Sequence, residues 1–371
     1  MANEDKATRY HRLKRRATVA AAALGVLFLL VLLISGVSAA LRDAAAALSG
    51  GSFLLTVVAY VTVLVLAVET LQLPLSFYQG ITLERRYGLS TETTARWWRD
   101  QAKGTAVTLV FAIGAAVITW SLLRWAPDRW WIFAALAFIV LLIGIAQLAP
   151  VLLLPLFYEI KPLERQALTE RLLALARRAG TRVLGVFEWR LSDRTRKANA
   201  ALAGIGRTRR ILVSDTLLAE HSDDEIEVIL AHELAHHVYR DIWFAIALES
   251  LLIVAGLYLA DRILSVYSSS FGLTGKDDIA ALPLLVLTLG GVSLALLPVA
   301  NGISRAHERR ADRYALTMTR NVPAFVSAMK RLSAQNLAEE QPSKVVEVLF
   351  HSHPPISARI AAAQDWALQN K

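Results

Sequence analysis

The stretch Ile229-Leu230-Ala231-His232-Glu233-Leu234-Ala235-His236-His237 places two histidines four positions apart on either side of an acidic residue. Residues four apart share one face of an α-helix, so His232 and His236 can bind a single metal ion. Glu233 cannot readily join both histidines on the metal, but its carboxylate can reach a water molecule held there. This arrangement suits a general base acting on metal-activated water.

The residues before this motif predict the helix that the motif requires. Ser222-Asp223-Asp224-Glu225 has the form of a capping box, with acidic residues in the first turn. Apolar residues then follow at roughly helical spacing, at Ile226, Ile229, Leu230, Leu234 and Val238. The motif therefore lies within a helix. His237 points about a hundred degrees away from the two histidines, and we interpret it as structural or solvent-facing.

Outside this helix the composition is that of a membrane protein. The 371 residues are 55% hydrophobic and 19% charged, against roughly 45–50% and about 25% in soluble domains. The mean hydropathy is +0.43. Six apolar stretches approach the ~20 residues that a helix needs to cross a bilayer. They are Ala17–Gly36, Phe53–Leu73, Gly104–Leu123, Trp131–Leu154, Ile242–Ala260 and Ile279–Ala300.

The basic residues indicate how these spans are oriented. The net charge is +9, and Lys and Arg are concentrated before the first span and between the second and third, over residues 6–16 and 85–103. The positive-inside rule then places both termini and the polar block Tyr158–Asp241 in the cytoplasm. Topology accounts for the charge, so no nucleic-acid partner is expected. The absence of cysteine excludes disulfides and thiolate zinc ligands.

Two features of the spans have alternative interpretations. The first span, with Val37-Ser38-Ala39 after it, resembles a signal peptide, but its apolar run is longer than the usual ~7–15 residues. Glu69 and Glu249 fall within spans. Because charge is costly in the bilayer, each glutamate either faces the bundle interior or reaches an interface.

A third metal ligand is expected after the last span, in the segment Asn301–Asp312. Glu308 can bind the metal, and Asp312, four residues later, can accept a hydrogen bond from a ligating histidine. If the flanking helices extend out of the membrane, both motifs emerge at similar heights, because the last two spans form an antiparallel pair. One alternative is a charged surface helix. Another is that His307 is the ligand, although it would face elsewhere than Asp312.

Several blocks in this order resemble the integral-membrane zinc endopeptidases known as type I CAAX prenyl proteases and their bacterial relatives. The resemblance extends from about Leu73 to Ile360. Its blocks include Leu83–Ser90, Ser192-Asp193-Arg194-Thr195, Asn199-Ala200, Gly204-Ile205-Gly206 before a strand expected at Arg210–Val213, the metal helix, Glu308 with Ala311-Asp312, and His353-Pro354-Pro355 with Arg359.

The resemblance implies a role for each of these matching residues. His232, His236 and Glu308 would be the ligands of one Zn²⁺ per chain, with Glu233 as general base and Asp312 as support. It implies further that His353 and Arg359 face the active site, where they stabilise the oxyanion or contact substrate. Extended substrate would pair with the edge strand Lys197–Gly204, at Asn199 and Ala200.

The expected fold is therefore mainly α: a polytopic membrane bundle of about six spans with a zincin-like catalytic region that contains a small β element. Residues 1–157 form the N-terminal membrane region and residues 158–371 the metallopeptidase region. The larger eukaryotic members of the family are commonly described with seven spans.

The expected function is zinc-dependent endopeptidase activity at the cytoplasmic surface of the lipid bilayer. The resemblance suggests that the substrate is a peptide or protein, membrane-associated or prenylated, processed at a CAAX-type C-terminus. One alternative is a broad-specificity quality-control protease for membrane proteins. Another is a catalytically silent scaffold or transporter, which Glu233 argues against because a structural metal site needs no base.

Overall fold

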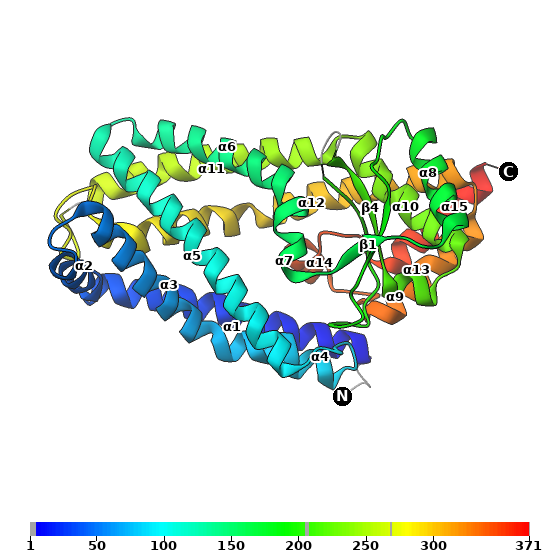
Figure 1. Ribbon diagram of the computed structural model, residues 1–371, viewed down its shortest axis with the longest axis horizontal. Coiled ribbons are helices and arrows are strands. Elements are labelled where there is room, and N and C mark those ends of the chain that lie inside the picture. Colours follow the sequence, from blue (N-terminus) through cyan, green and yellow to red (C-terminus); the bar gives the residue numbers. More distant parts are fainter. Residues whose placement is uncertain (1–4, 205–207, 268, 371) are drawn as a thin grey trace.

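The computed structural model describes residues 5–204, 208–267 and 269–370 of the chain. Long helices run along the long axis of the molecule, and a small sheet lies at one end of them (Figure 1). We call this the sheet end. The opposite end, where residues 34–53, 125–130 and 269–282 connect the helices, is called the far end. The predicted mainly helical bundle with a small β element is confirmed.

Six helices among the described residues are long and apolar enough to cross a membrane, as the sequence predicts. They are α1 (Lys6–Ile34), α3 (Phe53–Phe77), α5 (Thr94–Trp125), α6 (Trp130–Leu152), α11 (Asp241–Tyr267) and α12 (Leu282–Thr319). Several outrun their apolar stretches, and α12 continues well beyond Ala300. A shorter helix at the far end, α2 (Val37–Leu48), was not predicted from the sequence.

The two glutamates within the spans have different surroundings. Glu69 on α3 faces α5, where Gln101 Nε2 donates to its Oε2 at 3.0 Å and Thr105 Oγ1 lies 3.4 Å away. Glu249 on α11 is exposed. A contact between helices therefore accounts for Glu69, whereas exposure within a span gives no such account of Glu249.

The sheet end contains four strands and the remaining helices. The strands have the order β1-β2-β4-β3, with β2 and β4 parallel and the other pairs antiparallel. The strand expected at Arg210–Val213 is β4, while Ile205 and Gly206 lie outside the described residues. The elements are α4 (Leu83–Arg86), α7 (Leu154–Phe157), β1 (Ile160–Pro162), α8 (Gln166–Arg178), β2 (Val186–Trp189), β3 (Ala200–Ala203), β4 (Arg210–Ser214), α9 (Asp215–Glu220), α10 (Asp223–Val238), α13 (Val322–Asn336), α14 (Lys344–Phe350) and α15 (Ile356–Gln369).

The core of the sheet end holds the metal helix α10 in place. Ala200 and Leu202 of β3 point to one face of the sheet and join a buried cluster with Ile226 and Leu230 of α10. The predicted capping box is present: Ser222 Oγ accepts from the backbone N–H of Glu225, whose Oε2 accepts from Ser222 N at 2.8 Å. Capping and burial together fix the start and the rotation of α10.

The metal helix and the next span are separate helices. We based the similar heights of the two motifs on flanking helices that extend out of the membrane, but α10 ends at Val238 and α11 begins at Asp241. Arg240 has a positive φ of 59°, a left-handed conformation that ends an α-helix and that arginine rarely adopts. The Tyr239 ring next to it packs on the Arg310 guanidinium at 4.2 Å. Glycine usually supplies the left-handed residue that ends a helix, and there is none here. The break between α10 and α11 instead lies next to this tertiary contact.

Candidate metal centre

Three side chains from two distant helices converge at the sheet end. Ligand atoms of His232, His236 and Glu308 all lie within 4.8 Å of one another. His232 Nε2 is 3.2 Å from Glu308 Oε2, and His236 Nε2 is 3.4 Å from Glu308 Oε1. The histidines come from successive turns of α10, and the glutamate comes from α12. The packing of α10 on α12 thus brings together residues that are far apart in the sequence.

A carboxylate holds the other ring nitrogen of each histidine. His232 Nδ1 is 2.9 Å from Asp312 Oδ1, and His236 Nδ1 is 2.9 Å from Asp241 Oδ2. A proton on each Nδ1 leaves the Nε2 lone pair free to face Glu308. Such carboxylates fix the tautomer and the ring orientation of metal-binding histidines. Both rings are therefore oriented as ligands toward the same point.

Sequence reasoning identified Asp312 but missed Asp241. Asp241 follows the break at Arg240 and begins α11, which brings its carboxylate back toward His236. The Arg310 guanidinium also bonds to Asp241. The only hint in the sequence was that Asp241 is an acidic residue five positions after His236. On a continuous helix that residue would have pointed away from His236.

The donor set fits a divalent metal such as zinc. Two imidazole nitrogens and one carboxylate form a common catalytic zinc site, which leaves a position open for water. Glu308 Oε2 is buried, and none of the described residues meets it in hydrogen-bond geometry. This holds although nitrogens of His232 and His353 lie 3.2 and 2.8 Å away. A buried carboxylate oxygen facing nitrogens without a hydrogen bond is suited to a cation placed between them.

Glu233 lies beside this cluster in a partly buried position. Burial raises the pKa of its carboxyl group above the ordinary glutamate value, and charge on His232 and His236 opposes the shift. A raised pKa strengthens a carboxylate as a proton acceptor, which is the property that a general base needs.

His353 and Arg359 lie on different sides of the cluster. His353 Nδ1 is 2.8 Å from Glu308 Oε2, and the His353 side chain is 63% exposed. Arg359 on α15 instead donates to Asp312, from Nε to Oδ2 at 2.8 Å and from Nη2 to Oδ1 at 2.5 Å. Its Nη2 is 3.4 Å from His232 Nδ1, the nitrogen opposite the one that faces Glu308. Arg359 thus sits behind His232, whereas the sequence analysis expected it to face the active site.

The two remaining histidines of the motifs contact other groups. His237 Nε2 lies 3.0 Å from the Leu202 carbonyl oxygen, which links α10 to β3. Burial lowers the pKa of His237, favouring the neutral ring. His307, the alternative third ligand, has its Nδ1 3.6 Å from Asp241 Oδ1 and its ring against Phe244. His237 therefore has the expected structural position, and His307 lies outside the ligand cluster.

Strand β3, with Asn199 just before it, forms an edge of the sheet. It pairs with β4 on one side, and among the described strands none pairs with its other side. The Asn199 backbone is anchored to Ser214, with Asn199 N donating to Ser214 Oγ at 3.0 Å and Asn199 O accepting from Ser214 N at 2.9 Å. The Asn199 side chain is exposed and Ala200 is buried. The edge of β3 that faces away from β4 thus offers backbone groups to an extended peptide, apart from the Leu202 carbonyl, which His237 already contacts.

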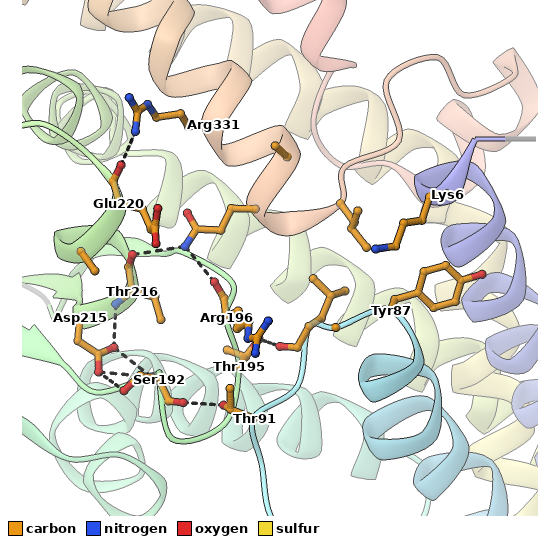
Figure 2. A pocket seen from close by; sticks show the side chains of 16 residues that line it. Lys6, Tyr87, Thr91, Ser192, Thr195, Arg196, Asp215, Thr216, Glu220 and Arg331 are labelled. Atoms are coloured by element: carbon orange, nitrogen blue, oxygen red, sulfur yellow. Dashed lines mark hydrogen bonds between the residues drawn. The ribbon is translucent and has the colours of Figure 1, made fainter.

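A separate cavity lies beside the loop that leads into β3, and Figure 2 shows how that loop is held. The cavity has a volume of about 870 Å³ and is lined by Lys6, Tyr87, Asp215 and Arg331 among others. Asp215 Oδ1 accepts from Ser192 N at 3.0 Å, and Thr91 Oγ1 donates to Ser192 O at 2.6 Å. The cluster of His232, His236 and Glu308 does not line this cavity. Its polar residues hold the loop to α9 and to residue 91.

Comparison with known families covers nearly all of the chain. The family model described as Peptidase family M48 matches residues 162–367. The model described as CAAX prenyl protease N-terminal, five membrane helices, matches residues 2–159. The described part of that second range holds four of the candidate spans together with α2.

Individual proteins agree with the family match. The uncharacterized metalloprotease YhfN of Bacillus subtilis is 33% identical over 90% of this chain and 79% of its own length. CAAX prenyl protease 1 of Saccharomyces cerevisiae is 29% identical over 81% of this chain and 70% of its own length. The crystal structure of S. mikatae Ste24p has the same fold, with a TM-score of 0.87 at 24% identity over 96% of this chain and 88% of that one. The chain therefore belongs to peptidase family M48 and is an integral-membrane metalloendopeptidase, consistent with its convergent His232, His236 and Glu308.

Proposed function

We propose that the metal is zinc and that His232, His236 and Glu308 hold one Zn²⁺ per chain. The observation that carries this proposal is the convergence of these three side chains within 4.8 Å, next to Glu233. When bound, zinc supplies Lewis acidity, which lowers the pKa of a water molecule and polarises the scissile carbonyl. Two nitrogens and one carboxylate oxygen match the ligand preference of zinc.

Glu233 acts as the general base in this proposal. Its carboxylate accepts a proton from the attacking water and then passes that proton to the leaving amine. Its side chain is partly buried, next in sequence to the first proposed ligand. The position of Glu233 beside both histidines supports this assignment, since the water must lie near the same cluster.

His353 and Arg359 have separate roles in our proposal. The exposed His353, next to Glu308, is placed to donate a hydrogen bond to the oxyanion that develops on the scissile carbonyl. Arg359 acts through Asp312: its two hydrogen bonds orient the carboxylate that holds His232. Arg359 is thus a positioning residue and does not contact substrate.

The substrate strand pairs with the free edge of β3, beginning at Asn199 and Ala200. Backbone hydrogen bonds along such an edge bind extended chains with little demand on sequence. His237 joins α10 to the Leu202 carbonyl, so β3 and the metal helix keep a fixed separation. A peptide on this edge would therefore lie at a defined distance from Glu233.

The sheet end faces the cytoplasm in this proposal, and residues 1–157 and 158–371 form the membrane and metallopeptidase regions. The concentration of Lys and Arg at residues 6–16 and 85–103 supports this orientation, because both segments lie at the sheet end. The substrate would then be cut where the spans leave the bilayer on its cytoplasmic side.

The proposed substrate is a membrane-associated protein cut near a CAAX-type C-terminus, as the name of the yeast relative states for that protein. The alternative is a broad-specificity peptidase for membrane proteins, which the sequence-tolerant pairing on β3 favours. Purified full-length protein in detergent tests both. A farnesylated CAAX peptide is compared with the same peptide without the prenyl group and with an unfolded membrane protein.

Each outcome of that comparison has a definite meaning. The proposed processing role predicts faster cleavage of the farnesylated peptide, abolished by a chelator and restored by Zn²⁺. Equal cleavage of all three substrates would support the broad-specificity alternative. Cleavage that a chelator does not inhibit would contradict the zinc mechanism itself.

A further inference from the structure

An apolar hollow lies on the face of the sheet that points away from the metal helix. Its volume is about 400 Å³, and all its lining residues are apolar or aromatic: Ala149, Leu153, Leu154, Phe157, Trp189, Ala201, Ala203 and Leu212. We call it the sheet hollow. One wall is the sheet, and the other is formed by the end of α6 and by α7, which lies beside β1 in Figure 1.

The two faces of β3 have different surroundings. Ala200 and Leu202 are buried in the core that contains α10. Ala201 and Ala203 point the opposite way, because successive residues of a strand alternate between faces. Ala201 pairs with Leu212, which also lines the sheet hollow. Because the alanine side chains are single methyl groups, they leave room in the sheet hollow on the β3 side.

A peptide paired on this edge would continue the pleat of the sheet. Its residues opposite Ala201 and Ala203 would then point to the same face as those alanines, with Cβ atoms about 4.5–5.5 Å away. Every second substrate side chain is therefore directed toward the hollow, and the residues between are directed toward the α10 side.

We propose that the sheet hollow is a specificity subsite that takes an apolar side chain of the substrate strand, with Ala201, Ala203, Leu153 and Phe157 as its determinants. This proposal rests on the proposed function, because it needs a substrate paired on β3. A charged substrate residue would lose its water there without gaining a partner. Arg210, which lies on the same sheet face, is directed toward the Phe187 ring, with its guanidinium carbon 5.3 Å from the ring centre.

The test is a position scan with internally quenched peptides and the purified full-length protein. Each position around the scissile bond carries Leu, Asp or Lys in turn, and kcat/KM is measured with and without chelator. We expect Leu to exceed Asp, at one position or at positions two apart, by more than the about 10–200-fold that a single methylene makes in an apolar pocket, because Asp would also bury an unpaired charge. A flat profile under chelator-sensitive cleavage would overturn the subsite alone. Absence of chelator-sensitive cleavage of every peptide would overturn the proposed function, and the subsite with it.

Charge substitution identifies the residues that form the subsite. In Ala201→Asp, the preference at the same position should change from Leu to Lys, because the hollow then holds a carboxylate. Ala219→Asp is the matched control, since Ala219 is an exposed alanine on α9 away from the hollow, and its profile should match the wild type. An unchanged preference for Leu in Ala201→Asp would contradict the proposal.

A binding measurement covers the case in which Ala201→Asp does not fold. Peptides carrying photo-leucine at each position are irradiated with Glu233→Gln, whose sheet hollow is intact. The position preferred in the scan should label Leu153 or Phe157, as detected by mass spectrometry. Labelling of these residues by a photoactivatable fatty acid, with none from any peptide, would instead assign the hollow to bilayer lipid.

Discussion

Buried carboxylates occur at both ends of the spans, but they are satisfied in different ways. At the far end, Asp278 is paired with Arg42 and also accepts from Thr274 N at 2.9 Å and Ala280 N at 2.9 Å. Asp261 accepts from Trp130 Nε1 at 2.9 Å and is paired with Lys276 at 2.7 Å. Each of these carboxylates has a cation and N–H donors of its own.

The sheet end has the opposite pattern. Glu308 faces Nε2 of His232 and of His236, each of which is held from behind by another carboxylate. Its Oε2 has no hydrogen bond among the described residues. A saturated carboxylate fixes helices to one another, whereas a carboxylate facing two imidazole nitrogens, each oriented by another carboxylate, can form a ligand set with them. Substitutions in this ligand set at the sheet end should therefore abolish metal binding and cleavage, whereas substitutions at the far end should lower stability.

The largest effect is expected at Glu308. Glu308→Ala removes the carboxylate of the ligand set, so the protein should lose its bound metal and all chelator-sensitive cleavage. Elemental analysis of the purified protein measures the metal, and peptide cleavage measures turnover. Glu249→Ala, at an exposed glutamate of α11, is the matched control and should retain both. One metal ion per chain in Glu308→Ala would refute the ligand assignment.

Glu233 should separate metal binding from chemistry. Glu233→Gln keeps the shape of the side chain but cannot accept the proton, so metal content should stay at one ion per chain. Turnover should fall by about 10²–10⁴-fold, the usual contribution of a general base. Parallel metal analysis and cleavage assays check this prediction. Wild-type turnover in Glu233→Gln would exclude the proposed role.

Local sequence patterns predicted the helices that carry this site, but not the break between α10 and α11. Helical spacing and the capping box predicted α10, and apolar length predicted the six spans that bring Glu308 to the level of His236. The break at Arg240 was not predictable, because arginine carries no local preference for a positive φ. Asp241 was missed for the same reason, since its contact with His236 depends on that break.

The position of Arg359 could not be predicted for a different reason. Arg359 lies on α15, and its direction depends on how α15 packs against α12 and α13. That packing turns its guanidinium to Asp312, which spacing along the chain does not encode. The edge position of β3 likewise depends on pairing between strands that are separated in sequence.

The next largest effect on metal affinity or turnover is expected at Asp312 and Asp241, the carboxylates that contact Nδ1 of the two histidines. Asp312→Asn retains a hydrogen-bond acceptor for His232 but removes the charge that Arg359 pairs with, so metal affinity or turnover should fall by about 10–100-fold. Asp241→Asn should cost less, because the His236 side chain is 26% exposed and that of His232 is 9% exposed. Metal affinity is measured by competition with a chromogenic chelator. A larger loss in Asp241→Asn than in Asp312→Asn would reverse this ranking.

The smallest effect on turnover is expected at the far end. Asp278→Ala leaves Arg42 without its buried partner and removes the acceptor for Thr274 and Ala280. Because Arg42 keeps Asp43 as a second partner at 2.8 Å, the main loss is that of buried N–H donors left without an acceptor, which should lower the free energy of unfolding by about 1–3 kcal/mol, seen as a lower Tm in detergent. The neighbouring Asp277 is exposed, so Asp277→Ala should leave the Tm unchanged. Turnover per folded molecule should match the wild type in both variants, because neither residue contributes to the metal cluster. A loss of turnover in Asp278→Ala as large as that in Asp312→Asn, at a temperature where the protein stays folded, would show that the two ends are coupled in catalysis.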